Sequence, residues 1–592
     1  MPVDTIPARF MEQGRIRPDS PAYYIRQSGS WRPTTWRDYV GEVRTATRAL
    51  LSLGVGDGET VCILGFNRPE WVIMDIANMA VGGAPAGIYT TCSAEEVQYI
   101  LHHAEAPVVL LEDEGQWEKV KSERANLPNL KHVVMMKDAP AIDDELVMSW
   151  DEFMARAEGT KDEEVDLHIA KLEEDKTATL IYTSGTTGPP KGVMLTHKNL
   201  AWTSQIAQGL VSLRAHDCSL SYLPLSHIAE QMFSIHGPIT AGASVYFAES
   251  IEAVPENVKE VQPTVFFGVP RIWEKFHAGV TGKLELATGT KAKLVTWARG
   301  VATRANTERN AGRTPSGVLG LQYALAQKII FSKLKPALGL GRARVCVSGA
   351  APISQEILEF FASLDIIVHE VYGQSEGTGP TSFNVPGRTR YGTVGPVLPG
   401  AEVRIAEDGE ICLKGPNVFA GYYKDDKNTA ATLIDGWLHS GDLGAFDADG
   451  YLNITGRKKD IIITAGGKNI TPKNIESSLK NIDVVGEAVL IGDRRKFISA
   501  LLSIDPDALD KWCADNGVPV DGALENSQLR SHLQAGVDKT NEKFARVEHV
   551  RKFTVLKRPL SIEEGELTPT LKVKRNAVNK SFASEIEAMY VD

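Results

Sequence analysis

Residues 179–198 read Thr179-Leu-Ile-Tyr-Thr-Ser-Gly-Thr-Thr-Gly-Pro-Pro-Lys-Gly-Val-Met-Leu-Thr-His-Lys198 and form the most informative segment of the chain. The apolar start predicts a short strand, from Ala178 to Tyr182, that runs into Thr183-Ser-Gly-Thr-Thr-Gly188. Glycines let the backbone approach a ligand and turn its N–H groups towards it. Hydroxyls add donors for phosphate oxygens and can ligate magnesium, and Lys191 adds a mobile positive charge. The segment therefore predicts a loop that binds a triphosphate.

This loop is not a Walker A motif, because that motif requires Gly directly before its lysine and Ser or Thr directly after it. Lys191 instead follows Pro190 and precedes Gly192. Pro189 and Pro190 also exclude a helix directly after the glycines. Taken alone, any six residues of this segment would be an ordinary polar surface turn. The whole string is far more specific than its parts.

Length and composition bound the class of protein. A chain of 592 residues is too long for a single core, so we expect at least two domains. The formal net charge of -11 argues against nucleic-acid binding. The six cysteines form no CxxC pair, which favours reduced thiols over zinc or redox motifs. With no secretory h-region and no apolar run that spans a bilayer, we expect a cytoplasmic protein and leave peripheral membrane contact open.

The first third of the chain alternates helix and strand signals. Thr35 can cap a helix that ends at Gly54, residues 61–64 form an apolar strand, and Ser93 with Glu96 forms a capping box before the strand at 107–111. This rhythm predicts an α/β fold with mostly parallel sheets flanked by helices. The acidic residues 158–175 are expected to be a solvated connection. Residues 277–340 are helical in pattern and predict a surface hairpin without chemistry.

Two later segments carry side chains suited to nucleotide chemistry. Gly349-Ala-Ala351 follows a strand, and its small side chains leave room for a flat base. Gly373-Gln-Ser-Glu-Gly377 offers a hydroxyl and a carboxylate for a hard cation. The same five residues match the G-x-S-x-G nucleophile elbow, so a serine hydrolase based on Ser375 is an alternative from another class. The elbow needs a helix after its turn, however, and Gly377-Thr-Gly-Pro380 cannot begin one.

The string from Thr183 to Gly192 resembles the phosphate-loop signature of the adenylate-forming superfamily, which includes acyl-CoA synthetases, luciferases and peptide-synthetase adenylation domains. The stretch 371–376 resembles the superfamily's YGxTE motif, with serine in place of threonine. The stretches 223–231 and 265–273 resemble the long-chain and very-long-chain branch, including the bubblegum-type enzymes. This resemblance implies a large N-terminal domain at residues 1–456, a hinge at 457–460 and a small mobile α+β cap at 461–592.

The resemblance also implies roles for single residues in adenylate formation. Tyr372 would stack on adenine, Ser375 would contact the α-phosphate, and Asp442 and Arg457 would bind the ribose. The implied ATP site comprises Thr183, Ser184, Gly185, Thr186, Thr187, Gly188, Lys191, Gly349, Ala350, Ala351, Tyr372, Gly373, Gln374, Ser375, Asp442 and Arg457. The implied magnesium ligands are Thr183 and Glu376, and the implied catalytic residues are Lys572, Glu376 and Lys191. Lys574 is the fallback for Lys572, because Thr570-Leu571 replaces the commoner Ser-Gly before the lysine.

The remaining implied sites concern the acyl chain and the thiol. His227, Phe267 and Gly268 would line the acyl pocket, although Phe266, Phe267 and Trp273 could equally be core residues. Lys459 would be the hinge residue. Gly466, Gly467 and Lys468 would approach the pantetheine arm of CoA, and a plain turn is the alternative for them.

The reaction implied by the resemblance is that of a long-chain fatty acid–CoA ligase. A fatty acid and ATP would give acyl-adenylate and pyrophosphate, and CoA would then give acyl-CoA and AMP. The expected cofactors are ATP, Mg²⁺ and the co-substrate CoA. A fatty acyl-AMP ligase that loads a carrier protein is the nearer alternative. Acyl chain length and oligomeric state cannot be predicted from this sequence.

Overall fold

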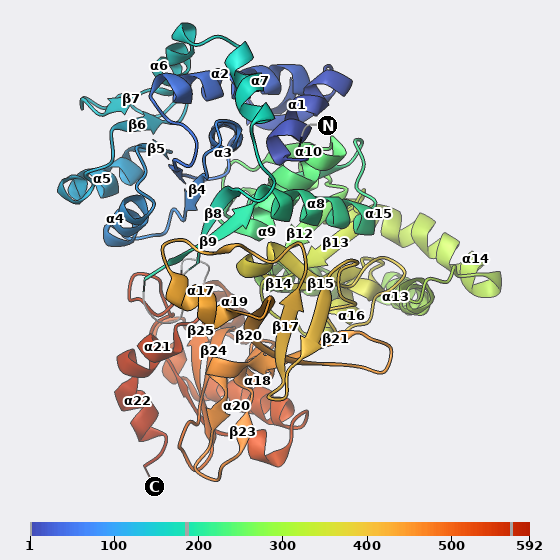
Figure 1. Cartoon of the computed structure of the whole chain (residues 1–592). Helices are drawn as coiled ribbons and strands as arrows, with labels where there is room; N and C mark the ends of the chain where they lie inside the picture. The colour runs from blue at the N-terminus through green and yellow to red at the C-terminus, as the bar shows by residue number, and fades with distance from the viewer. Residues whose placement is uncertain (1–2, 184–188, 569–571, 592) are drawn as a thin grey trace.

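The computed structural model describes residues 3–183, 189–568 and 572–591. A large N-terminal domain fills the upper part of Figure 1, and a smaller C-terminal domain lies below it. The N-terminal domain contains four sheets, and the C-terminal domain contains a three-stranded sheet and a two-stranded hairpin. The expected α/β fold with a separate small α+β domain is confirmed. Within the described residues, no helix has the length and apolar character needed to cross a bilayer.

The largest sheet has eight strands in the order β18-β9-β8-β4-β3-β5-β6-β7. Its strands are β3 (Val61–Leu64), β4 (Ala86–Ile88), β5 (Val108–Leu111), β6 (His132–Met135), β7 (Val147–Met148), β8 (Thr177–Thr183), β9 (Lys191–Thr196) and β18 (Gly421–Tyr422). The strands from β7 to β8 pair in parallel, and β9 and β18 add antiparallel pairs at one edge. Val61 and Ile63 enter one hydrophobic core while Cys62 and Leu64 enter another. Burial on both faces is typical of an interior parallel strand.

Two further sheets have the strand orders β10-β11-β1-β2 and β12-β13-β14-β15. In each, the first three strands pair in parallel and the fourth pairs antiparallel with the third. Their strands are β1 (Pro21–Gln27), β2 (Ser30–Thr35), β10 (Cys218–Ser221), β11 (Ser244–Phe247), β12 (Val265–Gly268), β13 (Val345–Ser348), β14 (Val368–Gln374) and β15 (Gly379–Phe383). The fourth sheet is antiparallel throughout and has no counterpart in the βα rhythm of the sequence. Its strands are β16 (Glu402–Ile405), β17 (Glu410–Lys414), β19 (Leu433–Ile434), β20 (Trp437–Phe446) and β21 (Leu452–Arg457).

Helices cover these sheets and begin where the capping signals lie. Thr35 accepts a hydrogen bond from the N–H of Asp38 at the start of α2, and Ser93 with Glu96 forms the expected capping box of α4. The helices of the N-terminal domain are α1 (Ile6–Ile16), α2 (Trp36–Ser52), α3 (Pro69–Ala80), α4 (Ala94–His103), α5 (Glu114–Ser122), α6 (Trp150–Ala155), α7 (Glu163–Ala170), α8 (His197–Val211), α9 (Ile228–Gln231), α10 (Gly237–Ala241), α11 (Val254–Val261), α12 (Pro270–Glu285), α13 (Gly289–Asn310), α14 (Gly317–Ala326), α15 (Ser332–Ala337), α16 (Gln355–Ser363) and α17 (Asp426–Thr432).

The acidic stretch 158–175 is exposed over most of its length, as expected, but it is more than a connection. The segment contains helix α7, and Arg44 of α2 binds the carboxylates of Asp162 and Asp166 at 2.6 and 2.8 Å. Charge alone suggested a solvated connection, because the pairing cation lies far away in the sequence.

The C-terminal domain has its own cores. Its strands are β22 (Ile462–Ile463), β23 (Asn469–Ile470), β24 (Val485–Ile491), β25 (Ile498–Ile504) and β26 (Val550–Val555), and its helices are α18 (Pro472–Leu479), α19 (Pro506–Asn516), α20 (Ser527–Asn541), α21 (Arg575–Ser581) and α22 (Ala583–Ala588). Along β25, Ala500 and Leu502 face α18, α19 and α20, while Leu501 faces α21 and α22. The fully buried β25 therefore holds the domain together without residues from the N-terminal domain.

Among the described residues, two ion pairs join the domains. Arg271 of α12 pairs with Asp505, and Lys543 pairs with Glu356 of α16 at 2.5 Å. The C-terminal domain is thus held against the helices that cover the β12–β15 sheet.

Candidate active site

The carboxylate of Asp442 lies where three strands meet. Asp442 of β20 is directly opposite Arg457 of β21, and the Arg457 Nε donates to its Oδ1 at 2.8 Å. The Tyr372 hydroxyl of β14 donates to its Oδ2 at 2.9 Å. Asp442 is buried, so these two donors compensate for the loss of water around its charge. The structure thus brings together three of the residues predicted for the nucleotide.

A second group of side chains links the segment predicted to bind the triphosphate to the Glu376 motif. Lys191, opposite Thr183 in the β8–β9 pair, places its ammonium 4.8 Å from the centre of the Tyr422 ring. The Tyr422 hydroxyl donates to the Glu376 carboxylate at 2.7 Å. Thr183, Lys191 and Glu376 therefore lie in one neighbourhood, with a hydroxyl and a carboxylate available to a hard cation. The other predicted loop residues, Ser184, Gly185, Thr186, Thr187 and Gly188, lie outside the described residues.

The turn at Gly373 to Glu376 depends on close backbone packing. A Cβ at Gly373 would lie 1.7 Å from the carbonyl oxygen of Gly379, so only glycine fits there. Gln374 ends β14, and Ser375 begins a three-residue turn of helix, η5 (Ser375–Gly377), in which it is buried. The chain then enters β15, antiparallel to β14. The strand–turn–helix context of a nucleophile elbow is therefore not formed at Ser375.

Lys572 comes from the C-terminal domain and reaches the charges of the N-terminal site. Lys572 is exposed to solvent, but many protein atoms lie around its side chain, and the charges that act on it come from both domains. Desolvation by these atoms, together with the cations of Arg457 and Lys473, lowers the pKa of Lys572 to about 8, against the opposite effect of Asp442 and Glu376. These shifts show that Lys572 shares one electrostatic environment with the predicted nucleotide and metal residues.

The loop geometry separates Lys572 from its fallback. Lys572 donates its N–H to the Thr568 hydroxyl at 3.0 Å and accepts from the Thr568 N–H at 2.8 Å. Lys574 donates its N–H to Glu566 and caps α21, beside the Arg575–Glu476 ion pair inside the C-terminal domain. Of the two lysines, Lys572 is the one that influences the N-terminal site.

The predicted acyl residue Phe267 lies beside the turn at Gly349-Ala-Ala351, which is predicted to hold the adenine base. Phe267 stacks on Phe233 with ring centres 4.5 Å apart, and a Cβ on Gly349 would come within 3.3 Å of the Phe267 ring. Ala350 has a left-handed backbone at φ 68°, and Ala350 and Ala351 are exposed. Gly268 is buried, and its carbonyl accepts from the Trp273 indole at 3.1 Å. Phe266 and Trp273 are fully buried in another cluster, so they are core residues.

His227 is the third predicted acyl residue with a defined contact. It caps α9, and its Nδ1 accepts from the Ala229 N–H at 3.1 Å. Burial, together with the Lys572 charge, lowers the pKa of His227 to about 4. His227 is therefore neutral at neutral pH and lies on the side of the site that Lys572 faces.

Comparisons with known proteins match this arrangement of motifs. The family described as AMP-binding enzyme covers residues 10–423, and the AMP-binding enzyme C-terminal domain covers residues 459–592. The chain belongs to the AMP-binding enzyme family.

The relatives of this AMP-binding enzyme include ligases of long-chain fatty acids. The long-chain-fatty-acid–CoA ligase ACSBG2 of Xenopus laevis is 36% identical and is aligned over 100% of this chain and 84% of its own length. The long-chain-fatty-acid–CoA ligase FadD15 of Mycobacterium tuberculosis is 35% identical over 99% of this chain and 97% of its own. The resemblance to the bubblegum-type branch is thereby confirmed.

Solved structures support the fold. The anthranilate CoA ligase AuaEII in complex with anthranoyl-AMP has a TM-score of 0.73 at 22% identity, covering 99% of this chain and 98% of the other. The o-succinylbenzoate CoA synthetase MenE of Bacillus subtilis has a TM-score of 0.69 at 22% identity, covering 96% and 97%.

Two predicted sites of the AMP-binding enzyme lie in exposed segments. Lys459 is exposed in η6 (Lys458–Asp460), directly after β21. Gly466, Gly467 and Lys468 are exposed in the turn between β22 and β23, and β23 lies near the lower edge of the molecule in Figure 1. Their predicted roles in hinge motion and thiol binding stay predictions.

Sequence reasoning missed two residues that the structure adds to this site. Tyr422 links Lys191 to Glu376, and Lys473 is partly buried near Arg457 and Lys572, where desolvation lowers its pKa. For Lys473 a signal existed, since Thr471-Pro472 predicted a helix start and Lys473 lies in its first turn. For Tyr422 no local pattern distinguishes it from a core tyrosine.

A cluster of Glu410, Cys412 and His439 places possible metal ligands on β17 and β20. Glu410 already accepts from His439 at 3.0 Å, from the N–H of Gly441 at 2.8 Å and from Lys458 at 3.2 Å. These bonds connect the strand that carries Asp442 to the start of η6, which is a structural role.

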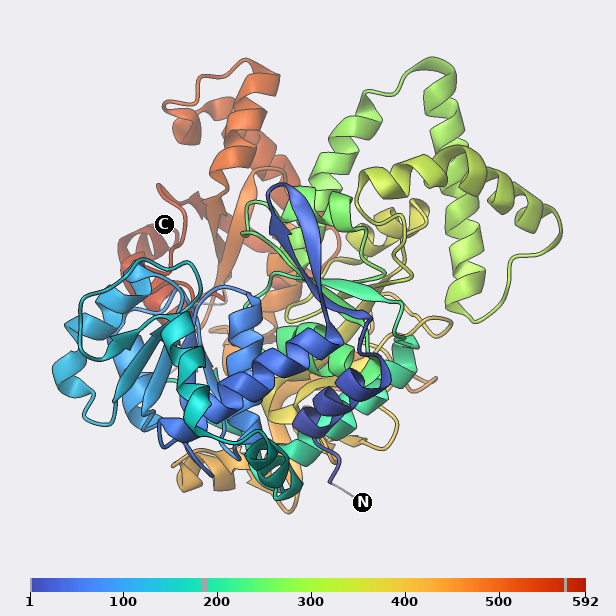
Figure 2. The ribbon, with the colours of Figure 1, turned by 90° about the horizontal axis from the view of Figure 1, so that it is seen from above.

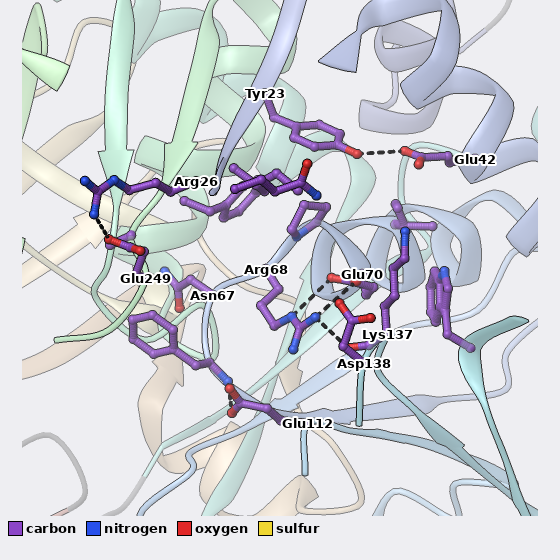
Figure 3. A pocket seen from close by; sticks show the side chains of 18 residues that line it. Tyr23, Arg26, Glu42, Asn67, Arg68, Glu70, Glu112, Lys137, Asp138 and Glu249 are labelled. Carbon is purple, nitrogen blue, oxygen red and sulfur yellow. Dashed lines mark hydrogen bonds and ion pairs between the residues drawn. The ribbon is translucent and has the colours of Figure 1, made fainter. Parts of the chain in front are cut away.

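The cavity drawn in Figure 3, with a volume of about 370 Å³, is separate from the predicted residues. It lies beside β1 and the start of α3, and several of its charged groups pair with protein groups: Arg68 with Glu70, Arg26 with Glu249, and Glu42 with the Tyr23 hydroxyl. Burial raises the pKa of Glu42 to about 6. Because these groups satisfy one another, the cavity does not indicate the reaction site.

Proposed function

We propose that this AMP-binding enzyme is a long-chain fatty acid–CoA ligase. In the first step a carboxylate oxygen of the fatty acid attacks the α-phosphorus of ATP and expels pyrophosphate, giving acyl-adenylate. In the second step the sulfur of CoA attacks the acyl carbon and expels AMP. The activity printed in the names of the relatives supports this class of substrate.

The observation that carries the proposal is the shared electrostatic environment of Lys572, Asp442, Arg457 and Glu376. A carboxylate and a triphosphate repel each other, so cations must offset the charge as they meet. In the proposal Lys572 and Lys191 supply this charge from opposite domains. The second step needs the CoA thiol at the same carbon, so Lys572 must withdraw.

The remaining roles follow from the chemistry of the groups. Asp442 and Arg457 would bind the ribose, Tyr372 would stack on adenine between Gly349-Ala-Ala351 and the Glu376 motif, and His227, Phe267 and Gly268 would line the acyl pocket. Mg²⁺, held by Thr183 and Glu376, would neutralise phosphate charge when bound. The Glu376 carboxylate fits this use, because the Tyr422 hydroxyl bonds its Oε1 and the other oxygen is available to a hard cation.

In the second step the exposed turn at Gly466, Gly467 and Lys468 would approach CoA after rotation about Lys459, with the cap domain at residues 461–592 moving as a unit. Cytoplasmic location is also proposed, because all six cysteines are unpaired and buried.

The test is a pyrophosphate-release assay over saturated acids of rising chain length, with and without CoA. Release should require ATP, magnesium and a long-chain acid, and acyl-CoA should form only with CoA. Accumulation of acyl-AMP that ignores CoA would favour the carrier-protein ligase. Ester hydrolysis without ATP that is lost in Ser375→Ala would favour the hydrolase.

A further inference from the structure

Helices α13 and α14 extend from the side of the N-terminal domain, as both ribbon views show (Figures 1 and 2). The helix continues from α14 through the wider turn η4 (Gln327–Phe331) into α15. Along it, Val318, Leu321, Leu325 and Ile329 have 72, 75, 49 and 38% of their surface exposed. Their spacing of three, four and four residues places them on one helix face. We call these four residues the outer stripe.

The opposite face of the same helix is packed. Leu319, Tyr323 and Ala326 form a hydrophobic cluster with Trp297 and Val301 of α13. The helix is therefore apolar on two sides, but only one side is covered. A helix that is apolar all round is normally buried on all sides, and contiguous exposed apolar surface marks an interaction site.

The outer stripe is held on a rigid support. The buried carboxylate of Asp365 accepts from Arg309 of α13 at 3.0 Å, from the Tyr323 hydroxyl at 2.7 Å and from Lys335 at 3.0 Å, and Gln327 also donates to it. Four donors, one from α13 and three from the continuous helix α14–η4–α15, converge on one carboxylate, which fixes the hairpin on the domain. The packing beneath the helix therefore keeps the outer stripe facing the solvent.

The charge around the stripe differs from that of the rest of the chain. Residues 281–340 contain ten lysines and arginines and two glutamates, giving a formal charge of +8 within a chain of net charge -11. Lys328 and Lys333 are exposed beside the stripe, and neither has an ion pair within the described ranges. An apolar stripe flanked by free lysines is complementary to an anionic lipid surface.

The position of the hairpin in the chain connects it to the acyl side of the site. It is inserted between β12, which ends at Phe267 and Gly268, and the neighbouring parallel strand β13, which leads to Gly349. We propose that the outer stripe docks this enzyme on an anionic membrane surface. Resting on the proposed function, this would bring the acyl-binding side next to the lipid phase in which long-chain acids reside.

The experiment measures vesicle binding of the full chain without ATP or CoA, so its result does not depend on ligase activity. Protein is sedimented with sucrose-loaded vesicles of phosphatidylcholine alone or with added phosphatidylglycerol, at low and high salt. The test variant is Leu321→Ser, Leu325→Ser and Ile329→Ser together. The matched control is Leu167→Ser, Ile251→Ser and Val520→Ser, which are exposed by 51, 52 and 52% on other surfaces.

Wild type and control should bind the anionic vesicles, and the stripe variant should bind at least about tenfold more weakly. Lys328→Gln with Lys333→Gln should weaken binding severalfold on anionic vesicles only. Equal binding of the stripe variant and wild type overturns the proposal, as does a wild type that binds neither vesicle. A concentration-dependent dimer in sedimentation velocity that the stripe variant abolishes would instead assign the stripe to a second copy of the chain.

A second measurement does not depend on the folding of the triple variant. Because all six native cysteines are buried, Leu321→Cys provides a single exposed thiol for an environment-sensitive fluorophore. Anionic vesicles should shift its emission to the blue, and the same label at Leu167→Cys should not respond. An unchanged emission at Leu321→Cys overturns the proposal.

Discussion

The lowered pKa of Lys572 predicts a pH limit for the first half-reaction. An ordinary lysine with a pKa near 10.5 would stay charged through pH 9, whereas burial lowers the Lys572 pKa to about 8. The charged fraction is then about nine-tenths at pH 7 and about one-tenth at pH 9. Since the proposed step needs the positive charge, activity should be present below the pKa and lost as pH rises through it. We expect kcat/KM for ATP to fall about tenfold between these two pH values.

The assay is pyrophosphate release with a long-chain acid and no CoA, at ATP concentrations well below KM. Under these conditions kcat/KM reports the pKa of the free enzyme, before ATP adds its own charge. Lys572→Ala should lose at least about a hundredfold in this step, yet still convert supplied acyl-adenylate and CoA into acyl-CoA. Lys572→Arg is the matched control, because arginine stays charged over this range and its residual activity should not fall.

Two results would refute this reasoning. One is a wild-type profile that stays flat to pH 9 while the protein remains folded. The other is a Lys572→Arg variant that keeps the same decline, which would assign the titration to another group. A Lys572→Ala variant with normal adenylation would also remove Lys572 from the reaction.

Further variants test the other parts of the site. Asp442→Ala removes the carboxylate proposed for the ribose and therefore its charge-assisted hydrogen bonds, so the ATP concentration that half-saturates the enzyme should rise by about tenfold to a hundredfold. An unchanged ATP titration would contradict the ribose role. Lys459→Pro fixes φ in η6, so the variant should still form acyl-adenylate but should not form the thioester when each half-reaction is measured separately. Equal loss of both half-reactions in a folded protein would count against a hinge at Lys459. Arg271→Ala removes the ion pair with Asp505 between the domains. The ratio of the adenylation rate to the thioester-forming rate should fall, by less than about tenfold because the pair is partly exposed. A ratio that matches wild type would show that this pair does not hold the domains together.

Much of the site could be predicted from sequence because its parts are local. The capping residues Thr35 and Ser93 and the polar turn at Glu376 each act through neighbours a few residues away, and the glycines and hydroxyls predicted for the triphosphate are contiguous in the sequence. Their order along the chain was specific enough to indicate the family, which the comparisons confirmed.

By itself, then, the sequence determined the parallel strands, the helix starts and the chemical groups offered to a nucleotide. Only the tertiary structure decided that Lys572 lies within reach of the charges of Asp442 and Glu376, that Tyr422 joins Lys191 to Glu376, and that Arg44 pairs with the acidic helix α7. It also decided which side of α14 is left uncovered. Periodicity reports how side chains repeat along an element, but pairing between distant charges and burial of one apolar face depend on which elements pack together.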